Sequence, residues 1–199
     1  MQSNSTPIKP TFLFNANLCT GCHACSVACK DKHDLPIGLL YRRVREHGGG
    51  QWTIGPDTTF TQDIFAYYIS MSCNHCEDAA CLLACPSGAM QKDEHGVVFI
   101  DQNLCIACGR CAKACPYDAP QMDNERKKMR KCDFCRDELA LGKMPVCVAA
   151  CPCRALDFGS YDVMAERYDD VPVMEPLLNP EMTKPHFFCL PHRHAKNFL

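Results

Sequence analysis

Cysteine is the residue whose number and spacing stand out in this chain. The sequence has 199 residues and 18 cysteines, and sixteen of these fall into four blocks of four. The first and third blocks have the spacing C-x2-C-x2-C-x3-C, the second C-x2-C-x4-C-x3-C and the fourth C-x2-C-x11-C-x3-C. In chain order the blocks are Cys19, Cys22, Cys25 and Cys29; Cys73, Cys76, Cys81 and Cys85; Cys105, Cys108, Cys111 and Cys115; and Cys132, Cys135, Cys147 and Cys151.

Such spacing indicates iron–sulfur clusters. In bacterial two-cluster ferredoxins, the first three cysteines of C-x2-C-x2-C-x3-C bind one cluster, and the fourth, followed by proline, binds the other. Proline follows the last cysteine of three blocks, as Pro86, Pro116 and Pro152, whereas Lys30 takes this place in the first. The spacing therefore predicts four [4Fe–4S] clusters bound through iron by the sixteen block cysteines, and it predicts no catalytic residue.

Zinc and disulfides are the other common uses of closely spaced cysteines. Structural zinc takes two separated C-x2-C pairs, which the repeated C-x2-C-x2-C runs do not match. Disulfide frameworks belong to secreted proteins, and residues 1–10 lack the charged and apolar regions of a secretory signal. No run of 18 apolar residues predicts a membrane span. The net charge of -2 gives no indication of a nucleic-acid partner.

Five further residues could interact with the clusters but are not predicted to be ligands. Cys153 and Cys189 are predicted to be unligated thiols, buried or at an interface. Because every block already has four thiolates, His23 and His75 are expected to pack within the ligand loops. Arg110, inside the third block, gives the hypothesis of a cation that raises the potential of that cluster. The alternative for Arg110 is a solvated surface side chain.

Two basic runs accompany the blocks. They are Arg42, Arg43 and Arg45, and Arg126, Lys127, Lys128, Arg130 and Lys131. We expect the first run to form a solvated face. The second run directly precedes the fourth block, so stabilisation of reduced clusters, or docking to an acidic partner, competes there with a solvated face.

The ligand loops need strands and short helices to hold them. Aromatic and β-branched residues predict strands over residues 65–70 and 97–100, with a weaker one over 11–15. Short helical turns over 112–114 and 148–150 would carry the last cysteines of the third and fourth blocks.

The other segments carry weaker signals. Residues 31–64, which include the run Gly48–Gly50, are predicted to be a linker-like insertion. Residues 162–168 predict a helix, and the tail after it is expected to lie extended over a surface. The tail prolines are Pro172, Pro176, Pro180, Pro185 and Pro191.

The order of the spacings resembles that of the four-cluster electron-transfer subunits of molybdopterin-dependent oxidoreductases. Within that family the sequence is most similar to the iron–sulfur electron-transfer subunits of anaerobic dimethyl sulfoxide reductases, over about residues 11–160. The matching stretches are Cys19–Cys22, Phe65–Glu77 (FAYYISMSCNHCE), Cys85–Met90, Cys115–Tyr117, Lys131–Asp133 and Arg154–Gly159. Nitrate reductase subunits of the family replace one third-block cysteine, so the complete third block argues against nitrate reductase.

The resemblance implies how the cysteines share the clusters. Each block gives three thiolates to one cluster and its last thiolate to a neighbour. The implied sets are Cys19, Cys22, Cys25 and Cys151 for cluster one; Cys132, Cys135, Cys147 and Cys29 for cluster two; Cys73, Cys76, Cys81 and Cys115 for cluster three; and Cys105, Cys108, Cys111 and Cys85 for cluster four.

The resemblance also implies the fold class. We expect an α+β protein of two bacterial-ferredoxin-like double-cluster modules, one inserted in the other. Residues 11–45 and 121–160 would form the outer module, with the first and fourth blocks, and residues 60–120 the inner module, with the second and third. Residues 161–199 would form an extended C-terminal tail that wraps a partner.

For function, the resemblance implies a non-catalytic subunit that relays electrons in anaerobic respiration. Electrons would pass from a membrane quinol-oxidising anchor subunit, at cluster four, to a molybdopterin catalytic subunit, at cluster one. That subunit would reduce dimethyl sulfoxide or a related S- or N-oxide. The complex would lie peripherally on the bacterial inner membrane, on the periplasmic face by export with a partner, with the cytoplasmic face as the alternative.

Two other functions remain open. One is the equivalent subunit of a polysulfide, thiosulfate or tetrathionate reductase, or of formate dehydrogenase. The other is a free polyferredoxin that shuttles between enzymes. The long insertion and the tail favour a subunit that wraps partners over a compact shuttle.

Overall fold

A three-stranded sheet joins an early strand of the chain to two late ones in the computed structural model, which describes residues 9–168 and 182–195. Its central strand, β1 (Pro10–Asn15), pairs antiparallel with β10 (Leu156–Ser160) and parallel with β11 (Phe187–Leu190). Helix α6 (Tyr161–Tyr168) packs against β1 and β10. The sheet therefore brings the segment before the first block beside the segment after the fourth.

Short helices carry the cysteines. The helices are α1 (Ala24–Lys32), α2 (Ala80–Leu83), α3 (Arg110–Ala114), α4 (Arg136–Ala140) and α5 (Val146–Ala149). Helix α1 packs against α5, and α2 packs against α3. The helices of the first and fourth blocks thus form one pair, and those of the second and third blocks form the other.

Two hairpins of three-residue strands follow the second and third blocks. Strand β6 (Met90–Lys92) pairs with β7 (Val98–Ile100), and β8 (Gln121–Asp123) pairs with β9 (Lys128–Arg130). Strands this short are not stable alone. Contacts with the cysteine loops stabilise them. For example, the backbone N–H of buried Met129 in β9 donates to the Cys105 sulfur at 3.4 Å.

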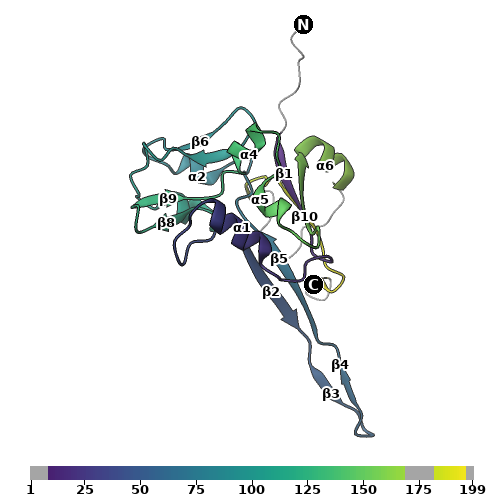
Figure 1. The fold of residues 1–199 in the computed structure, drawn as a ribbon. Helices are drawn as coiled ribbons and strands as arrows, with labels where there is room; N and C mark the ends of the chain where they lie inside the picture. Colours follow the sequence, from purple (N-terminus) through teal and green to yellow (C-terminus); the bar gives the residue numbers. More distant parts are fainter. Residues whose placement is uncertain (1–8, 169–181, 196–199) are drawn as a thin grey trace.

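A long two-stranded ribbon projects from the body of the protein (Figure 1). Strand β2 (Arg43–Gly49) pairs antiparallel with β5 (Phe65–Met71), and β3 (Trp52–Ile54) pairs with β4 (Phe60–Gln62) at the far end. The large apolar side chains Trp52, Ile54 and Phe60 are all exposed on this outer hairpin.

The predicted elements fare unevenly. The strands expected over 11–15, 65–70 and 97–100 are confirmed as β1, β5 and β7, and the helix expected over 162–168 is α6. The linker-like insertion is wrong for residues 43–49, 52–54 and 60–62, because β2 pairs with β5 along its whole length, Gly48 and Gly49 included, and β3 pairs with β4.

The tail prediction is also corrected in part. Residues 187–190 are extended, but they belong to the core and not to a surface segment, because they complete the sheet as β11 with Cys189 buried. The prolines at 172, 176 and 180 lie outside the described residues. Within the described ranges, no helix has both the length and the apolar character needed to cross a bilayer.

The main core joins β1 to the fourth-block loop. Phe12 is 1% exposed and stacks on the Phe134 ring with centroids 4.0 Å apart. Phe12→Ala should lower the free energy of unfolding by about 3–5 kcal/mol, because it empties a buried aromatic site. The measurement is the urea midpoint for anaerobic loss of cluster absorbance. Ile54→Ala, at a side chain that is 65% exposed, is the control and should leave the midpoint in place. Equal midpoints for the two variants would contradict this account of the core.

Candidate iron–sulfur cluster site

Three cavities are each lined by four block cysteines. The space between the lining atoms, part of which is open to solvent, is about 310, 350 and 290 Å³. The cysteines that line them are, in the same order, Cys19, Cys22, Cys25 and Cys151; Cys73, Cys76, Cys81 and Cys115; and Cys85, Cys105, Cys108 and Cys111. In every case three cysteines come from one block and the fourth is the last cysteine of another block.

The other four block cysteines form a buried group of their own. Cys29 interacts electrostatically with Cys147 and Cys135, and Cys132 interacts with Cys29. All four are buried. The sixteen cysteines therefore lie in four quartets with the membership that the resemblance implies. Iron ligation by these quartets remains a prediction.

Left-handed backbone recurs at one equivalent position in all four blocks. The residue just before the second cysteine of each block has positive φ: Gly21 at 69°, His75 at 44°, Ala107 at 56° and Phe134 at 62°. Three of these residues are not glycine. Positive φ is unfavourable for such residues, and proteins usually retain it only at functional sites. The shared conformation indicates that the blocks are copies of one ligand loop.

Glycine is needed at the first of these positions for a second reason. A Cβ atom built on Gly21 would lie 2.6 Å from the ring of Tyr68 in β5. The first ligand loop therefore sits directly against the base of the projecting ribbon.

The packed thiols fit a metal cluster. Burial and, after it, the neighbouring Cys147 sulfur raise the pKa of Cys29 to about 12. Burial likewise raises the pKa of Cys81 and of Cys135 to about 12. Four thiols so placed cannot all ionise in the absence of a cation, whereas bound iron deprotonates its thiol ligands and offsets their repulsion.

Backbone amides point at the sulfurs. The N–H groups of Met90 and Ala155 donate to Cys85 and Cys151 at 3.4 and 3.3 Å. The N–H of Phe134 donates to Cys132 at 3.4 Å. Such donors stabilise the added negative charge of a reduced cluster.

His75 packs in its loop, as the sequence predicts. It is buried, its Nδ1 accepts the Val98 N–H at 3.1 Å, and burial holds its pKa well below the usual range. Its Nε2 has no partner among the described residues, although the ring lines the 350 Å³ cavity. An unpaired buried N–H beside four sulfurs fits a site that binds an anionic cluster. His23 is exposed and precedes α1.

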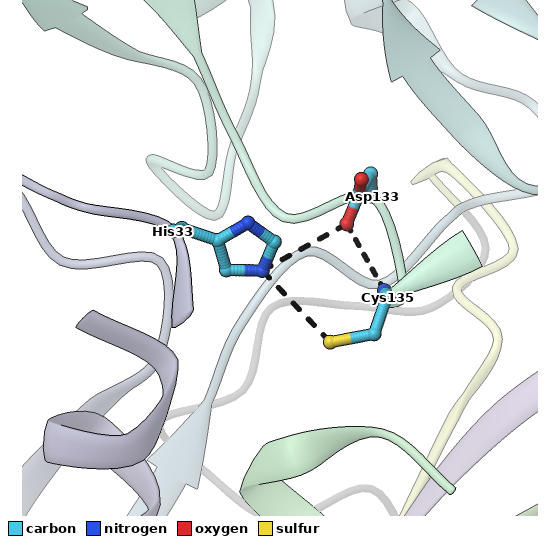
Figure 2. A group of neighbouring side chains, drawn as sticks. All are labelled: His33, Asp133 and Cys135. Carbon is cyan, nitrogen blue, oxygen red and sulfur yellow. Dashed lines mark hydrogen bonds and ion pairs between the residues drawn. The ribbon is translucent and has the colours of Figure 1, made fainter. Parts of the chain in front are cut away.

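His33 is a residue that the sequence analysis missed. Figure 2 shows its ring beside Asp133 and Cys135. Nε2 of His33 lies 3.8 Å from the Cys135 sulfur and 4.0 Å from the Asp133 carboxylate. The three side chains could hold a metal ion by distance. Because Cys135 already belongs to a quartet, we assign His33 and Asp133 to the surroundings of that quartet.

The two spare cysteines differ in setting. Cys189 is buried in β11, and burial raises its pKa to about 12. Cys153 is half-buried and lines the 310 Å³ cavity, with its sulfur 3.6 Å from the Thr20 hydroxyl. Arg110 is exposed, so water screens its charge, and we expect only a small effect on a cluster.

The basic runs divide into exposed and buried members. Arg42 is 1% exposed and Lys131 is 5% exposed, whereas Arg45 and Lys127 face solvent. The solvated face predicted for the first run is therefore wrong for Arg42. Arg42 directly precedes β2, where the chain leaves the core, and the composition of the basic run does not show this position.

The ligand loops, the paired short helices and the sulfur-lined cavities define a ferredoxin-like iron–sulfur protein. The family model described as "4Fe-4S dicluster domain" matches residues 64–161, which contain the second, third and fourth blocks. The chain is a mixed α/β protein that carries [4Fe–4S] clusters.

Comparison with curated proteins gives the particular family. The chain is 45% identical to the B subunit of anaerobic dimethyl sulfoxide reductase from Escherichia coli, over 93% of this chain and 90% of that protein. It is 44% identical, with the same coverage, to the protein of that name from Haemophilus influenzae. The B subunit of polysulfide reductase from Wolinella succinogenes is 34% identical over 93% of this chain and 95% of that protein. The chain belongs to the family of iron–sulfur electron-transfer subunits typified by the B subunit of dimethyl sulfoxide reductase.

Proposed function

We propose that this chain relays electrons through four [4Fe–4S] clusters, from a membrane quinol-oxidising subunit to a molybdopterin subunit that reduces dimethyl sulfoxide or a related S- or N-oxide. The observation that carries the proposal is the gathering of sixteen cysteines into four quartets. Each bound cluster would take up and release one electron. The residues of the chain would hold the clusters in a row and exclude water.

The proposed ligand sets follow the quartets. The last cysteine of each block would serve the cluster of its partner block, so that the first and fourth blocks would form the outer module and the second and third the inner one. The sets are Cys19, Cys22, Cys25 and Cys151; Cys29, Cys132, Cys135 and Cys147; Cys73, Cys76, Cys81 and Cys115; and Cys85, Cys105, Cys108 and Cys111.

Exposure supports the order of the row. Cys22 and Cys108 are the two block cysteines that are exposed, one in the first-block quartet and one in the third-block quartet. Electrons enter and leave a protein where a cluster is close to its surface, so these two quartets would be the ends. Exposed Leu18 and Val27 accompany the first block and exposed Leu104 and Ile106 the third, which suits burial against partner proteins.

The ribbon supports a partner at the first-block end. Val44 of β2 and Ser70 of β5 line the first-block cavity at its base. Exposed Trp52 and Phe60 lie on the outer hairpin. We assign this end to the catalytic subunit and the Cys108 end to the membrane anchor subunit, as the resemblance implies.

The proposed location follows from the partners. The chain would lie peripherally on the bacterial inner membrane, held there by the anchor subunit, on the periplasmic face after export with its partner. Polysulfide reductase is the second candidate complex, since its B subunit is also similar over nearly the whole length.

The test is anaerobic purification of the native protein from its membranes. It should elute with a large molybdopterin subunit and a membrane subunit, and it should contain about sixteen iron and sixteen sulfide per chain. Reduction of dimethyl sulfoxide by the purified complex would exceed reduction of polysulfide. Elution of the chain alone would overturn the complex, and about twelve iron per chain would remove one cluster from the proposal.

A further inference from the structure

Arg42 is a buried cation between two quartets. Its Nη1 donates to the Ser70 hydroxyl at 3.3 Å, and that hydroxyl lies 3.5 Å from the sulfur of Cys25 in the first-block quartet. Its charge also interacts with the sulfurs of Cys147 and Cys132, in the fourth-block quartet, and with the Cys25 sulfur itself. The guanidinium therefore lies buried between the two quartets and reaches the Cys25 sulfur through the Ser70 hydroxyl.

Lys131 occupies the corresponding place between the next two quartets. Its ammonium donates to the Cys73 sulfur at 3.3 Å, in the second-block quartet. It also donates to the carbonyl of Cys132 at 2.7 Å, in the fourth-block quartet, and to the carbonyl of Val98. All three hydrogen bonds of the ammonium are thus used within the core, at the boundary between the two modules.

Neither cation has a carboxylate partner in the described part of the chain. The ion pairs of residues 9–168 and 182–195 include Arg130 with Asp123 and Lys32 with Asp137, and none of them involves Arg42 or Lys131. A buried charge without a counter-charge is strongly destabilising. The neighbouring sulfurs are the negative groups present to balance it.

We propose that Arg42 and Lys131 are positioning residues that supply buried counter-charges to three clusters. Arg42 would raise the reduction potentials of the first- and fourth-block clusters, and Lys131 those of the fourth- and second-block clusters. The third-block cluster has neither cation beside it. This inference rests on the proposed function, since it needs clusters in the quartets.

The physical reason is the charge that each reduction adds. An electron placed on a cluster bound by four thiolates makes an already anionic group more negative. A fixed cation within hydrogen-bond distance, in a medium that water does not screen, favours the more negative state much more than a solvated cation does. Two cations placed between successive quartets would therefore make reduction of the first-, fourth- and second-block clusters more favourable.

The test is a redox titration of the complex in membranes, followed by low-temperature EPR. In Arg42→Gln the reduction equilibrium constants of the first- and fourth-block clusters should fall at least tenfold, which is about 59 mV for one electron. In Lys131→Gln those of the fourth- and second-block clusters should fall. The potential of the third-block cluster should stay unchanged in both variants.

Each variant has a matched control in the same basic run. Arg45→Gln and Lys127→Gln remove one exposed positive charge each, and they should leave all four potentials unchanged. Equal shifts in a control and its partner, or unchanged potentials in Arg42→Gln and Lys131→Gln, would overturn the proposal.

Iron content separates this test from the test of the proposed function. Fewer than about sixteen iron in the unsubstituted complex counts against the four clusters themselves. If Arg42→Gln loses iron, Arg42→Lys decides instead, because it keeps the charge and loses hydrogen bonds. If the reduction equilibrium constants in Arg42→Lys stay within a few-fold of those in the unsubstituted protein, the charge of Arg42 is responsible. If they fall as much as tenfold, the proposal is overturned.

Discussion

Cys151→Ala should abolish the cluster bound by the first block, although Cys151 belongs to the fourth. Iron and sulfide should fall from about sixteen to about twelve per chain, with the other three clusters retained. Electron transfer through the proposed complex should be lost with the cluster. The reason is that Cys151 lines the cavity of Cys19, Cys22 and Cys25, whereas Cys132 lies with Cys29.

The short helix α5 explains how one block reaches two quartets. Cys147 lies within α5, and Cys151 follows directly after the C-cap residue Ala150. The two cysteines are four positions apart, which corresponds to a rise of about 6 Å along a helix axis. Because α5 packs against α1, which carries Cys25 and Cys29, the same exchange occurs in reverse from the first block.

Three further variants test the exchange. Cys22→Ala should remove the same EPR signal as Cys151→Ala, and Cys132→Ala should remove a different one. Cys153→Ala is the control, because Cys153 lines the same cavity two residues further along the chain and lies outside the quartet. If Cys151→Ala and Cys132→Ala removed one common signal, each block would bind its own cluster. If Cys153→Ala removed the first-block signal, Cys153 would be a ligand.

The cysteine quartets could be anticipated because iron chemistry limits spacing. Three thiolates in a C-x2-C-x2-C run can reach one cluster only from a tight loop, so the sequence already constrains that loop. The left-handed residues at Gly21, His75, Ala107 and Phe134 could not be recognised in this way, since only one of them is glycine. Their conformation is imposed by the loop and not by local preference.

The ribbon and β11 could not be predicted from local sequence patterns. Gly48 and Gly49 are poor strand formers, yet they pair with Ala66 and Phe65 because β5 supplies the complete partner strand. Residues 187–190 follow a proline-rich segment, and they become a strand because β1 has a free edge on that side. In both cases a partner distant in sequence decides the structure.

The buried cations show the same limit for charge. A run such as Arg42, Arg43 and Arg45 favours a solvated face by composition, but alternate residues of a strand point to opposite sides. Only a side chain that enters the core can meet the sulfurs, and the sequence does not show where the strand leaves the core.

Removal of iron should unfold most of this protein. The larger core contains Cys25, Cys29, Cys132, Cys147 and Cys151 among its buried residues. The smaller core contains Cys81, Cys105 and Cys111. Without the clusters, these cysteines would line empty cavities and would no longer be joined to one another through iron. Metal binding is then the same event as folding for the segments that carry the blocks.

Nothing else in the described part of those segments is long enough to persist. Helices α2 and α5 have four residues each, and β6, β7, β8 and β9 have three each. Helices shorter than about 12 residues and isolated hairpins are marginal in water. Loss of iron also leaves Arg42 and Lys131 buried without a counter-charge, which penalises the native structure further.

The measurement is far-ultraviolet circular dichroism and limited proteolysis after anaerobic treatment with an iron chelator. Most of the regular secondary structure should disappear, and the segments that carry the blocks should become protease-sensitive. Iron with sulfide should restore both signals, whereas zinc should not, since a tetrahedral ion takes one set of four ligands and does not reproduce a cubane. Arg42→Gln should retain more structure after chelation than the unsubstituted chain, because it removes one unbalanced charge. An apoprotein with native dichroism would show that the strands and apolar side chains suffice, and that the fold forms without the clusters.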